Sequence, residues 1–198
     1  MFAVADGVGS MPGSPIASQA AVKAVRDAAE EGLFQRRGGL ALLLETVNHA
    51  VLDALSSLSD GNVRGATTLS VVAVQSGRVL IVSVGDSEVH MVGSSGDSRL
   101  QHELDHVPNR PNVLLAWIDG RTAFEPHVVS VAAESETLCL MSDGIPGALS
   151  RAEIARVVRN SHIGSAAREL VLAARGAGAN DDVTAVVVAV PPTSPAIR

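Results

Sequence analysis

The strand-like and helix-like segments of this chain come in blocks, and that order limits the folds available to it. A short apolar run at residues 2–5 is followed by two helical patterns, several β-branched runs, two more helical patterns and a last apolar run at 183–190. A doubly wound parallel sheet needs strands and helices that alternate, so this order argues against it. The order instead favours an α+β fold, with antiparallel strands in sheets and helices packed outside them.

Four segments carry helix signals. Ser14-Pro15 reads as an N-cap followed by proline at the first helical position, which predicts a helix to about residue 32. A second helix follows the Gly38-Gly39 break, because leucines and valines recur there at three- and four-residue steps. Ser150 and Glu153 fit a capping box for a helix to about residue 160, and another helix is expected at 165–175.

The strands are expected in the middle of the chain and at its end. Runs rich in β-branched residues predict them, with Ser76-Gly77 as a hairpin turn. Residues 93–112 are polar and contain two prolines, so they are expected to form a loop. The predicted strands after the first one are 67–74, 78–84, 88–92, 113–117, 127–131, 136–141 and 183–190.

Length and composition support a single folded domain. With 198 residues, the chain can bury one full core, and we expect a single domain at 1–190 with a flexible tail at 191–198. Hydrophobic residues make up 46% of the chain but aromatic residues only 2%, so the core must rest on aliphatic side chains. The one cysteine, Cys139, sits in an apolar run and is expected to be a buried small hydrophobic residue.

Charge and hydropathy exclude some partners. The formal net charge of −6 argues against binding to nucleic-acid phosphates. The sequence has no run of about 18 apolar residues and no secretory leader pattern, so no membrane partner is expected. A cytoplasmic protein is the resulting expectation.

Four aspartates share one local context, at the edge of an apolar strand. Asp6 and Asp86 follow predicted strands, Asp143 follows another, and Asp181 stands just before the last one. Strand ends in a compact sheet protein can converge on one rim, where clustered carboxylates repel unless a cation neutralises them. All-oxygen clusters suit Mg²⁺ or Mn²⁺. Each motif taken singly is also an ordinary turn signal.

The same residues carry a resemblance to a known family. Val4–Gly9 resembles the Asp-Gly-x-Gly signature of the type 2C metal-dependent protein phosphatases, the PPM family. Gly65–Thr68 is similar to that family's Gly-(Ser/Thr)-Thr strand start, and Val84–Ser87 to its Gly-Asp-Ser-Arg motif. Ser142–Gly144 matches Ser-Asp-Gly, and Asp181–Thr184 resembles the closing Asp-Asn-(Ile/Val)-Thr. The five motifs occur in the family's order along nearly the whole chain.

The resemblance implies a fold, a site and an activity. The fold would be two packed antiparallel sheets flanked by helices, with metals at one end. Asp6 would bridge two Mn²⁺ or Mg²⁺ ions with help from the Gly7 carbonyl, Asp143 and Asp181 would complete one shell, and Asp86 with Asp143 would hold a third, weaker ion. Asp6, Asp143 and Asp181 would then be the catalytic set. The reaction would be hydrolysis of phosphoserine or phosphothreonine by a metal-activated water, and the partner a phosphorylated signalling protein such as a kinase or its target.

The sequence also departs from the family pattern. Glu88 stands where Arg is usual, and Asp182 where Asn is usual. Family members begin with strands that carry a phosphate-gripping Arg and an Asn-Glu-Asp motif, whereas Asp6 lies almost at the first residue. We therefore expect either an N-terminally shortened form or the internal part of a longer chain, with weak metal binding and slow turnover.

Two alternative functions follow from these features. A phosphatase-like regulatory or binding module with little catalysis is the first, because part of the expected site is missing. The second is a zinc hydrolase, because His102, Glu103 and His106 form a literal H-E-x-x-H motif. That motif needs a long helix, and the glycines and prolines around it argue against one.

Overall fold

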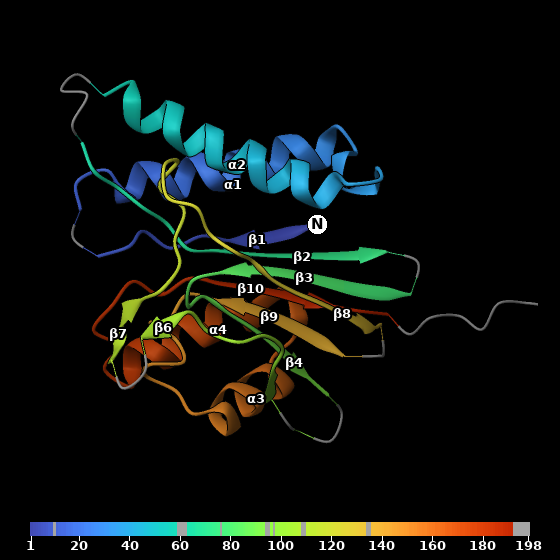
Figure 1. The fold of residues 1–198 in the computed structure, drawn as a ribbon. Helices are drawn as coiled ribbons and strands as arrows, with labels where there is room; N and C mark the ends of the chain where they lie inside the picture. The colour runs from blue at the N-terminus through green and yellow to red at the C-terminus, as the bar shows by residue number, and fades with distance from the viewer. Residues whose placement is uncertain are drawn as a thin grey trace, which may run out of the picture.

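Two antiparallel sheets lie face to face, and a pair of helices covers each outer surface (Figure 1). The computed structural model describes residues 1–9, 11–58, 63–75, 77–93, 96, 98–107, 110–133 and 136–191. The predicted flexible tail falls largely on 192–198, which lie outside the described residues. The predicted α+β class with two packed antiparallel sheets is confirmed.

The first sheet joins the start of the chain to its middle. Its strand order is β1-β2-β3-β8, and every neighbouring pair is antiparallel. Gln75 pairs with Arg78, so the predicted hairpin between β2 and β3 is confirmed, although Ser76 itself is outside the described residues. The strands are β1 (Phe2–Val4), β2 (Leu69–Gln75), β3 (Arg78–Val84) and β8 (His127–Ala132).

The second sheet brings the end of the chain back to the middle. Its order is β10-β9-β4-β5, and a separate two-stranded ribbon pairs β6 with β7. The strands are β4 (Glu88–Val92), β5 (Ser98–Leu100), β6 (His106–Val107), β7 (Arg110–Leu114), β9 (Thr137–Met141) and β10 (Ala185–Ala189). The prediction that 93–112 is a loop was wrong in part, because β5 lies within this segment and pairs with β4. Tertiary pairing overrides the polar composition of this segment.

The helices follow the sequence signals closely, with one error at a cap. Ser150 and Glu153 form the predicted capping box. Ser14 was expected to be an N-cap, but the cap is Gly13, and the Ser14 hydroxyl instead donates to the Val8 carbonyl at 2.8 Å. The helices are α1 (Ser14–Glu30), the 3₁₀ turn η1 (Leu33–Gln35), α2 (Gly39–Ser56), α3 (Arg151–Asn160) and α4 (Ile163–Gly176).

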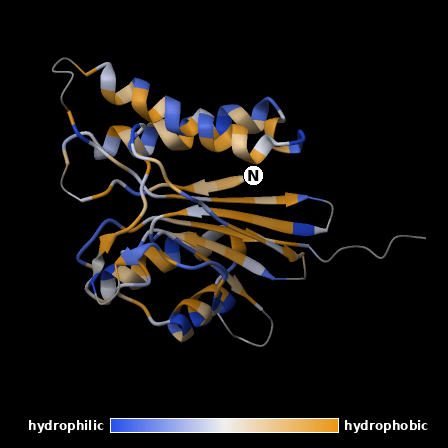
Figure 2. Cartoon of the chain, in the orientation of Figure 1, coloured by the Kyte–Doolittle hydropathy of each residue, from blue (hydrophilic) through white to orange (hydrophobic). Residues whose placement is uncertain are grey.

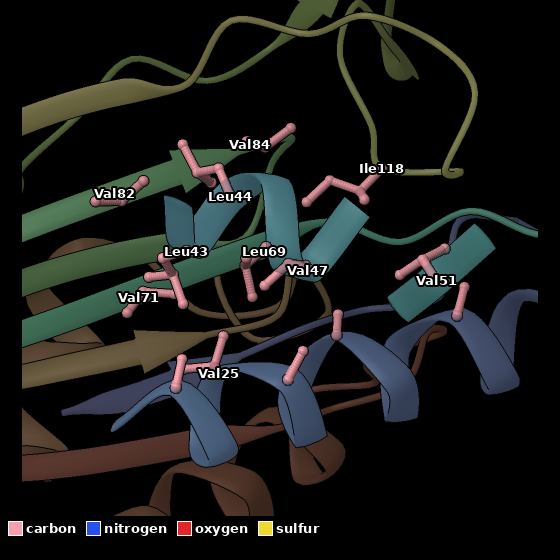
Figure 3. Packing of buried hydrophobic residues seen from close by; sticks show 14 of the residues in the cluster. Val25, Leu43, Leu44, Val47, Val51, Leu69, Val71, Val82, Val84 and Ile118 are labelled. Atoms are coloured by element: carbon pink, nitrogen blue, oxygen red, sulfur yellow. The ribbon is translucent and has the colours of Figure 1, made fainter. Parts of the chain in front are cut away.

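Aliphatic side chains fill three layers of core. In Figure 2 the central strands are hydrophobic along most of their length, whereas hydrophobic and hydrophilic residues alternate along the helices. Figure 3 shows Leu43, Val47 and Val51 of α2 packed over Leu69 and Val71 of β2. A second layer lies between the sheets, and a third lies under α3 and α4. Cys139 is fully buried, as predicted, and burial raises the pKa of its thiol to about 12.

The strand register brings six strand ends to one rim of the sandwich. Leu69 at the start of β2 pairs with Val84 at the end of β3, and the end of β1 lies beside them. In the other sheet, Met141 at the end of β9 pairs with both Glu88 and Ala185, which begin β4 and β10. The β6–β7 ribbon lies at this same end, on the left of Figure 1.

We expect Leu140→Ala to lower the free energy of unfolding by about 2–5 kcal/mol. Leu140 is fully buried between the sheets, so truncation loses its apolar burial and leaves a cavity. Urea denaturation followed by circular dichroism measures the change. The matched control is Leu172→Ala on α4, where the side chain is 47% exposed and the cost should stay within about 0.5 kcal/mol. Equal losses in the two variants would contradict this packing.

Candidate metal centre

The four aspartates singled out in the sequence meet in one cleft at this rim. The cleft has a volume of about 470 Å³ and is lined by Asp6, Asp86, Asp143 and Asp181, together with Gly7. Asp6 follows β1, Asp86 follows β3, Asp143 follows β9 and Asp181 precedes β10. The prediction that these carboxylates converge is therefore confirmed by the geometry.

Two threonines fix the position of Asp6. The Asp6 amide donates to the Thr68 hydroxyl at 3.0 Å, and the Thr68 amide donates back to the Asp6 carbonyl at 2.8 Å. The Thr67 hydroxyl donates to the same carbonyl at 2.8 Å. These hydrogen bonds attach the backbone at Asp6 to the two residues that immediately precede β2. In the sequence, these threonines indicate only the start of a strand.

A buried chain of hydroxyls links Asp6 to the turn at Asp86. The Thr68 and Ser87 hydroxyls lie 2.7 Å apart, and both residues are buried. Gly85 has a φ of 95°, and a Cβ placed there would lie 2.7 Å from the Thr68 methyl group. Both the positive φ and the lack of space exclude a side chain at residue 85. The turn that carries Asp86 can therefore approach Thr68 this closely only because residue 85 is glycine.

The β6–β7 ribbon is attached to this turn through Asp105 and His106. The Asp105 carboxylate accepts the Gly85 N–H at 2.8 Å and lies 2.8 Å from His127 Nε2. His106 Nε2 is 3.2 Å from Asp86 Oδ2. Both residues lie in the segment predicted as a loop at 93–112, where the sequence indicates His106 only as part of the zinc alternative and gives Asp105 no role. A carboxylate and an imidazole this close to the cleft fix how Asp86 is oriented.

The other wall of the cleft is tied together across β9 and β10. The Ser142 hydroxyl donates to the Asp182 carbonyl and accepts the Thr184 N–H, both at 3.0 Å. A Cβ on Gly144 would lie 2.4 Å from the Asp182 carbonyl oxygen, so the loops can approach this closely only with glycine there. Asp143 and Asp181 are thereby set on adjacent loops.

The carboxylates perturb one another. Burial, followed by the charges of Asp143, Asp181 and Asp86, raises the pKa of Asp6 to about 7. Burial, with the charges of Asp86 and Asp181, also raises the pKa of Asp143. Like charges this close cannot all be ionised cheaply without a counter-charge, so the site takes up either protons or cations.

The donors present fit a hard divalent cation. One buried oxygen, Asp143 Oδ1, has no hydrogen-bond partner among the described residues, which is unusual for a buried carboxylate. All candidate ligands are oxygens, the donors that Mg²⁺ and Mn²⁺ prefer. Within the described ranges, no three His, Cys, Asp or Glu side chains are placed as a finished ligand set.

The histidines of the H-E-x-x-H motif do not form a zinc site. Residues 102–105 have no regular secondary structure, and the two-residue strand β6 begins at His106. His102 is buried and its Nε2 accepts the Val89 N–H at 3.1 Å, while His106 faces Asp86. The zinc alternative is therefore wrong, because the motif needs both imidazoles on one face of a helix.

Glu88, where the family pattern has Arg, also turns inward. Its carboxylate lies against Nε2 of His90, whose ring is fully buried, and His90 Nδ1 is 2.6 Å from the Ser98 hydroxyl. These contacts pair the polar side chains of β4 and β5 with one another. Glu88 is not among the residues that line the cleft.

Comparison with known proteins decides the family. The sequence profile described as Protein phosphatase 2C matches residues 1–180. The chain belongs to the protein phosphatase 2C family. The resemblance seen in the five sequence motifs is confirmed, and so is the predicted class of activity, metal-dependent serine/threonine protein phosphatase.

Relatives of this family member agree in sequence and in fold. The serine/threonine phosphatase stp of Listeria innocua is 27% identical over 209 residues, covering 93% of this chain and 82% of the relative. The PPM Ser-Thr phosphatase MsPP from Mycobacterium smegmatis, solved in complex with cacodylate, is 25% identical, with a TM-score of 0.83 and coverage of 96% and 88%. The catalytic domain of PstP, solved with 2 manganese ions, is 21% identical, with a TM-score of 0.78 and coverage of 93% and 85%.

In metal-free buffer, we expect the protein to lose stability as the pH rises from about 4 to 7. Asp6 has a pKa of about 7 in the folded state, against 3.8 for an exposed aspartate in the unfolded chain, so the folded state binds more protons in this window. The effect should be about 1–2 kcal/mol, reduced because Asp6 is partly exposed. Urea denaturation with a chelator at pH 5 and pH 7.5 measures it. Asp6→Asn should flatten the slope, and an unchanged slope would contradict the shift.

Proposed function

We propose that Asp6, Gly7, Asp86, Asp143 and Asp181 form the metal-binding catalytic centre of this phosphatase. The observation that carries the proposal is their convergence from four strand ends into one cleft, with a buried Asp143 oxygen that has no hydrogen-bond partner among the described residues. Two Mn²⁺ or Mg²⁺ ions fit the roles of Asp6, Asp143 and Asp181, and a third ion fits Asp86 with Asp143. The family membership supports metal dependence, and the ion count is our proposal.

The residues of this chain have separate duties in the reaction. When bound, the divalent cations supply Lewis acidity, which lowers the pKa of water and offsets charge on the phosphoryl oxygens. Asp6 and Asp143 supply the negative charge that holds the cations. Thr68 and Ser142 hold the backbones that carry these carboxylates. Phosphoryl transfer depends mainly on such positioning and charge.

The substrate that fits this centre is a phosphorylated serine or threonine in another protein. The open cleft suits a side chain that carries phosphate, and a phosphorylated kinase or its target is the proposed partner. We further propose one phosphatase domain at residues 1–190, acting in the cytoplasm. The buried free thiol of Cys139 fits a reducing compartment. None of the helices in the described ranges is long and apolar enough to span a membrane.

Asp143→Asn should lower the Mn²⁺-dependent rate of phosphopeptide hydrolysis by at least about 100-fold, roughly 2.7 kcal/mol in activation free energy. The substitution keeps the size of the side chain and removes the charge that holds the cation. Phosphate release from a phosphothreonine peptide measures the rate. The matched control is Asp53→Asn, at an exposed position on α2, which should leave the rate unchanged.

Two results would contradict this proposal. Equal rates for the unmodified and Asp143→Asn proteins would remove Asp143 from the centre. Calorimetry addresses the alternative of a regulatory or binding module with little catalysis. Binding of two Mn²⁺ ions that is lost in Asp143→Asn supports the enzyme, whereas no Mn²⁺ binding by the unmodified protein supports the module.

A further inference from the structure

A second hollow continues from the metal cleft along the surface. It has a volume of about 600 Å³ and shares Val8 and Leu114 with the cleft. Its other walls come from the end of α2, from residues 63–66 and from the segment 113–122. A peptide that places one side chain in the metal cleft can therefore lay its neighbouring residues in this hollow, which we call the Trp117 groove.

The Trp117 groove has a preformed wall. The Asp119 carboxylate accepts the Arg121 N–H at 2.8 Å and the Thr122 N–H at 2.6 Å, and Trp117 Nε1 donates to it at 3.2 Å. Burial alone would raise the pKa of Asp119, but these hydrogen bonds hold it below its usual value. The turn that presents Trp117 and Arg121 is thus fixed before any ligand arrives, and little ordering entropy is lost on binding.

The same turn is anchored to α2. The Gly120 N–H donates to the Asn48 side chain at 3.1 Å. Gly120 has a φ of 78°, and a Cβ placed there would lie 2.4 Å from the Leu52 Cβ. Only glycine lets the turn approach the helix this closely. The position of Trp117 relative to the cleft is therefore set by α2.

The groove combines apolar surface with positive charge. Met11, Leu55, Val113 and Trp117 supply the apolar part, and Val113 is 44% exposed. Arg64 and Arg121 also line the groove, both are exposed, and neither forms an ion pair with an acidic side chain of the described residues. Asp119 also lines the groove, but its carboxylate already accepts the Arg121 and Thr122 N–H groups and the Trp117 indole N–H. The two guanidinium groups beside an apolar floor therefore favour a ligand that presents a carboxylate next to an apolar side chain.

We propose that the Trp117 groove selects substrates, by binding the residues that flank the phosphorylated serine or threonine. A large apolar side chain packs against Trp117, and an acidic side chain pairs with Arg64 and Arg121. The inference rests on the proposed function, because it assigns the metal cleft to the phosphorylated residue. Its two supports are the continuity of the groove with that cleft and the complementary charge.

Intrinsic fluorescence tests binding without catalysis. Trp117 is the single tryptophan and the chain has no tyrosine, so the emission reports on this groove alone. With Mg²⁺ present, the protein is titrated with non-hydrolysable phosphonate forms of four phosphothreonine peptides, which combine leucine or glycine with glutamate or lysine near the phosphorylated residue. We expect the leucine–glutamate peptide to bind about tenfold more tightly than the leucine–lysine peptide, a difference of roughly 1.4 kcal/mol. Indistinguishable affinities for all four peptides would overturn the proposal.

Charge reversal at Arg121 supplies a test that loss of folding cannot imitate. Arg121→Glu should reverse the preference, so that the lysine peptide binds more tightly than the glutamate peptide. With Mn²⁺, the ratio of kcat/KM for the two peptides should reverse as well, mainly through KM. The matched control is Arg168→Glu on α4, 76% exposed on the opposite helix layer, which should keep the original preference. An unchanged preference in Arg121→Glu would overturn the proposal.

Hydrolysis of p-nitrophenyl phosphate by the unmodified protein distinguishes failure of the groove proposal from failure of the catalytic proposal. Mn²⁺-dependent hydrolysis together with equal affinities for all peptides would overturn the proposal that the Trp117 groove selects substrates, and it would support the phosphatase activity. Peptide discrimination together with no hydrolysis of any substrate would keep the groove as a binding site and remove the catalytic proposal.

Discussion

Repulsion among carboxylates is the constraint on which the site end of this molecule depends. Asp6 and Asp143 both have raised pKa values, because burial and neighbouring negative charges penalise their ionised forms. Such a cluster would spread apart on a flexible support. The structure resists this with polar contacts beneath the cleft, where Thr68 meets Ser87 and Ser70 meets Ser83 in buried hydroxyl pairs. These hydroxyls form hydrogen bonds with one another and with the backbone, so the buried polar atoms that support the carboxylates all have partners.

The aliphatic core explains why the frame holds. Val, Leu, Ile and Ala side chains fill the space between the two sheets and under both helix layers, with few aromatic residues to impose special shapes. Because antiparallel pairing fixes the register of each strand to its neighbours, the six ends at the rim are positioned by the whole sandwich. The chemistry thus rests on loops, while their placement rests on the sheets.

Much of the fold and of the metal cleft could be predicted from local signals. The capping box at Ser150, the β2–β3 hairpin and the aspartates at strand ends each act over a few residues, so the sequence reveals them. Strands β5 and β6 and the start of β7 could not be predicted, because they pair with nearby strands through sequence that is polar and contains prolines. Ser14 was misassigned for a similar reason: its hydroxyl bonds to Val8 in a preceding loop. The contacts of Asp105 with Gly85 and His127 join residues 20 and 22 positions apart, and no local pattern signals them.

The contact between Gly120 and α2 gives that helix an influence well beyond packing. Asn48 and Leu52 belong to the outer layer of the molecule and have no contact with the carboxylate cleft, yet they set how far the turn bearing Trp117 stands from it. Changes in the volume of residue 52, or in the hydrogen-bonding group at residue 48, would tilt the recognition surface while leaving every proposed metal ligand in place. Substrate preference in this chain can therefore diverge through its scaffold, with the chemical step preserved.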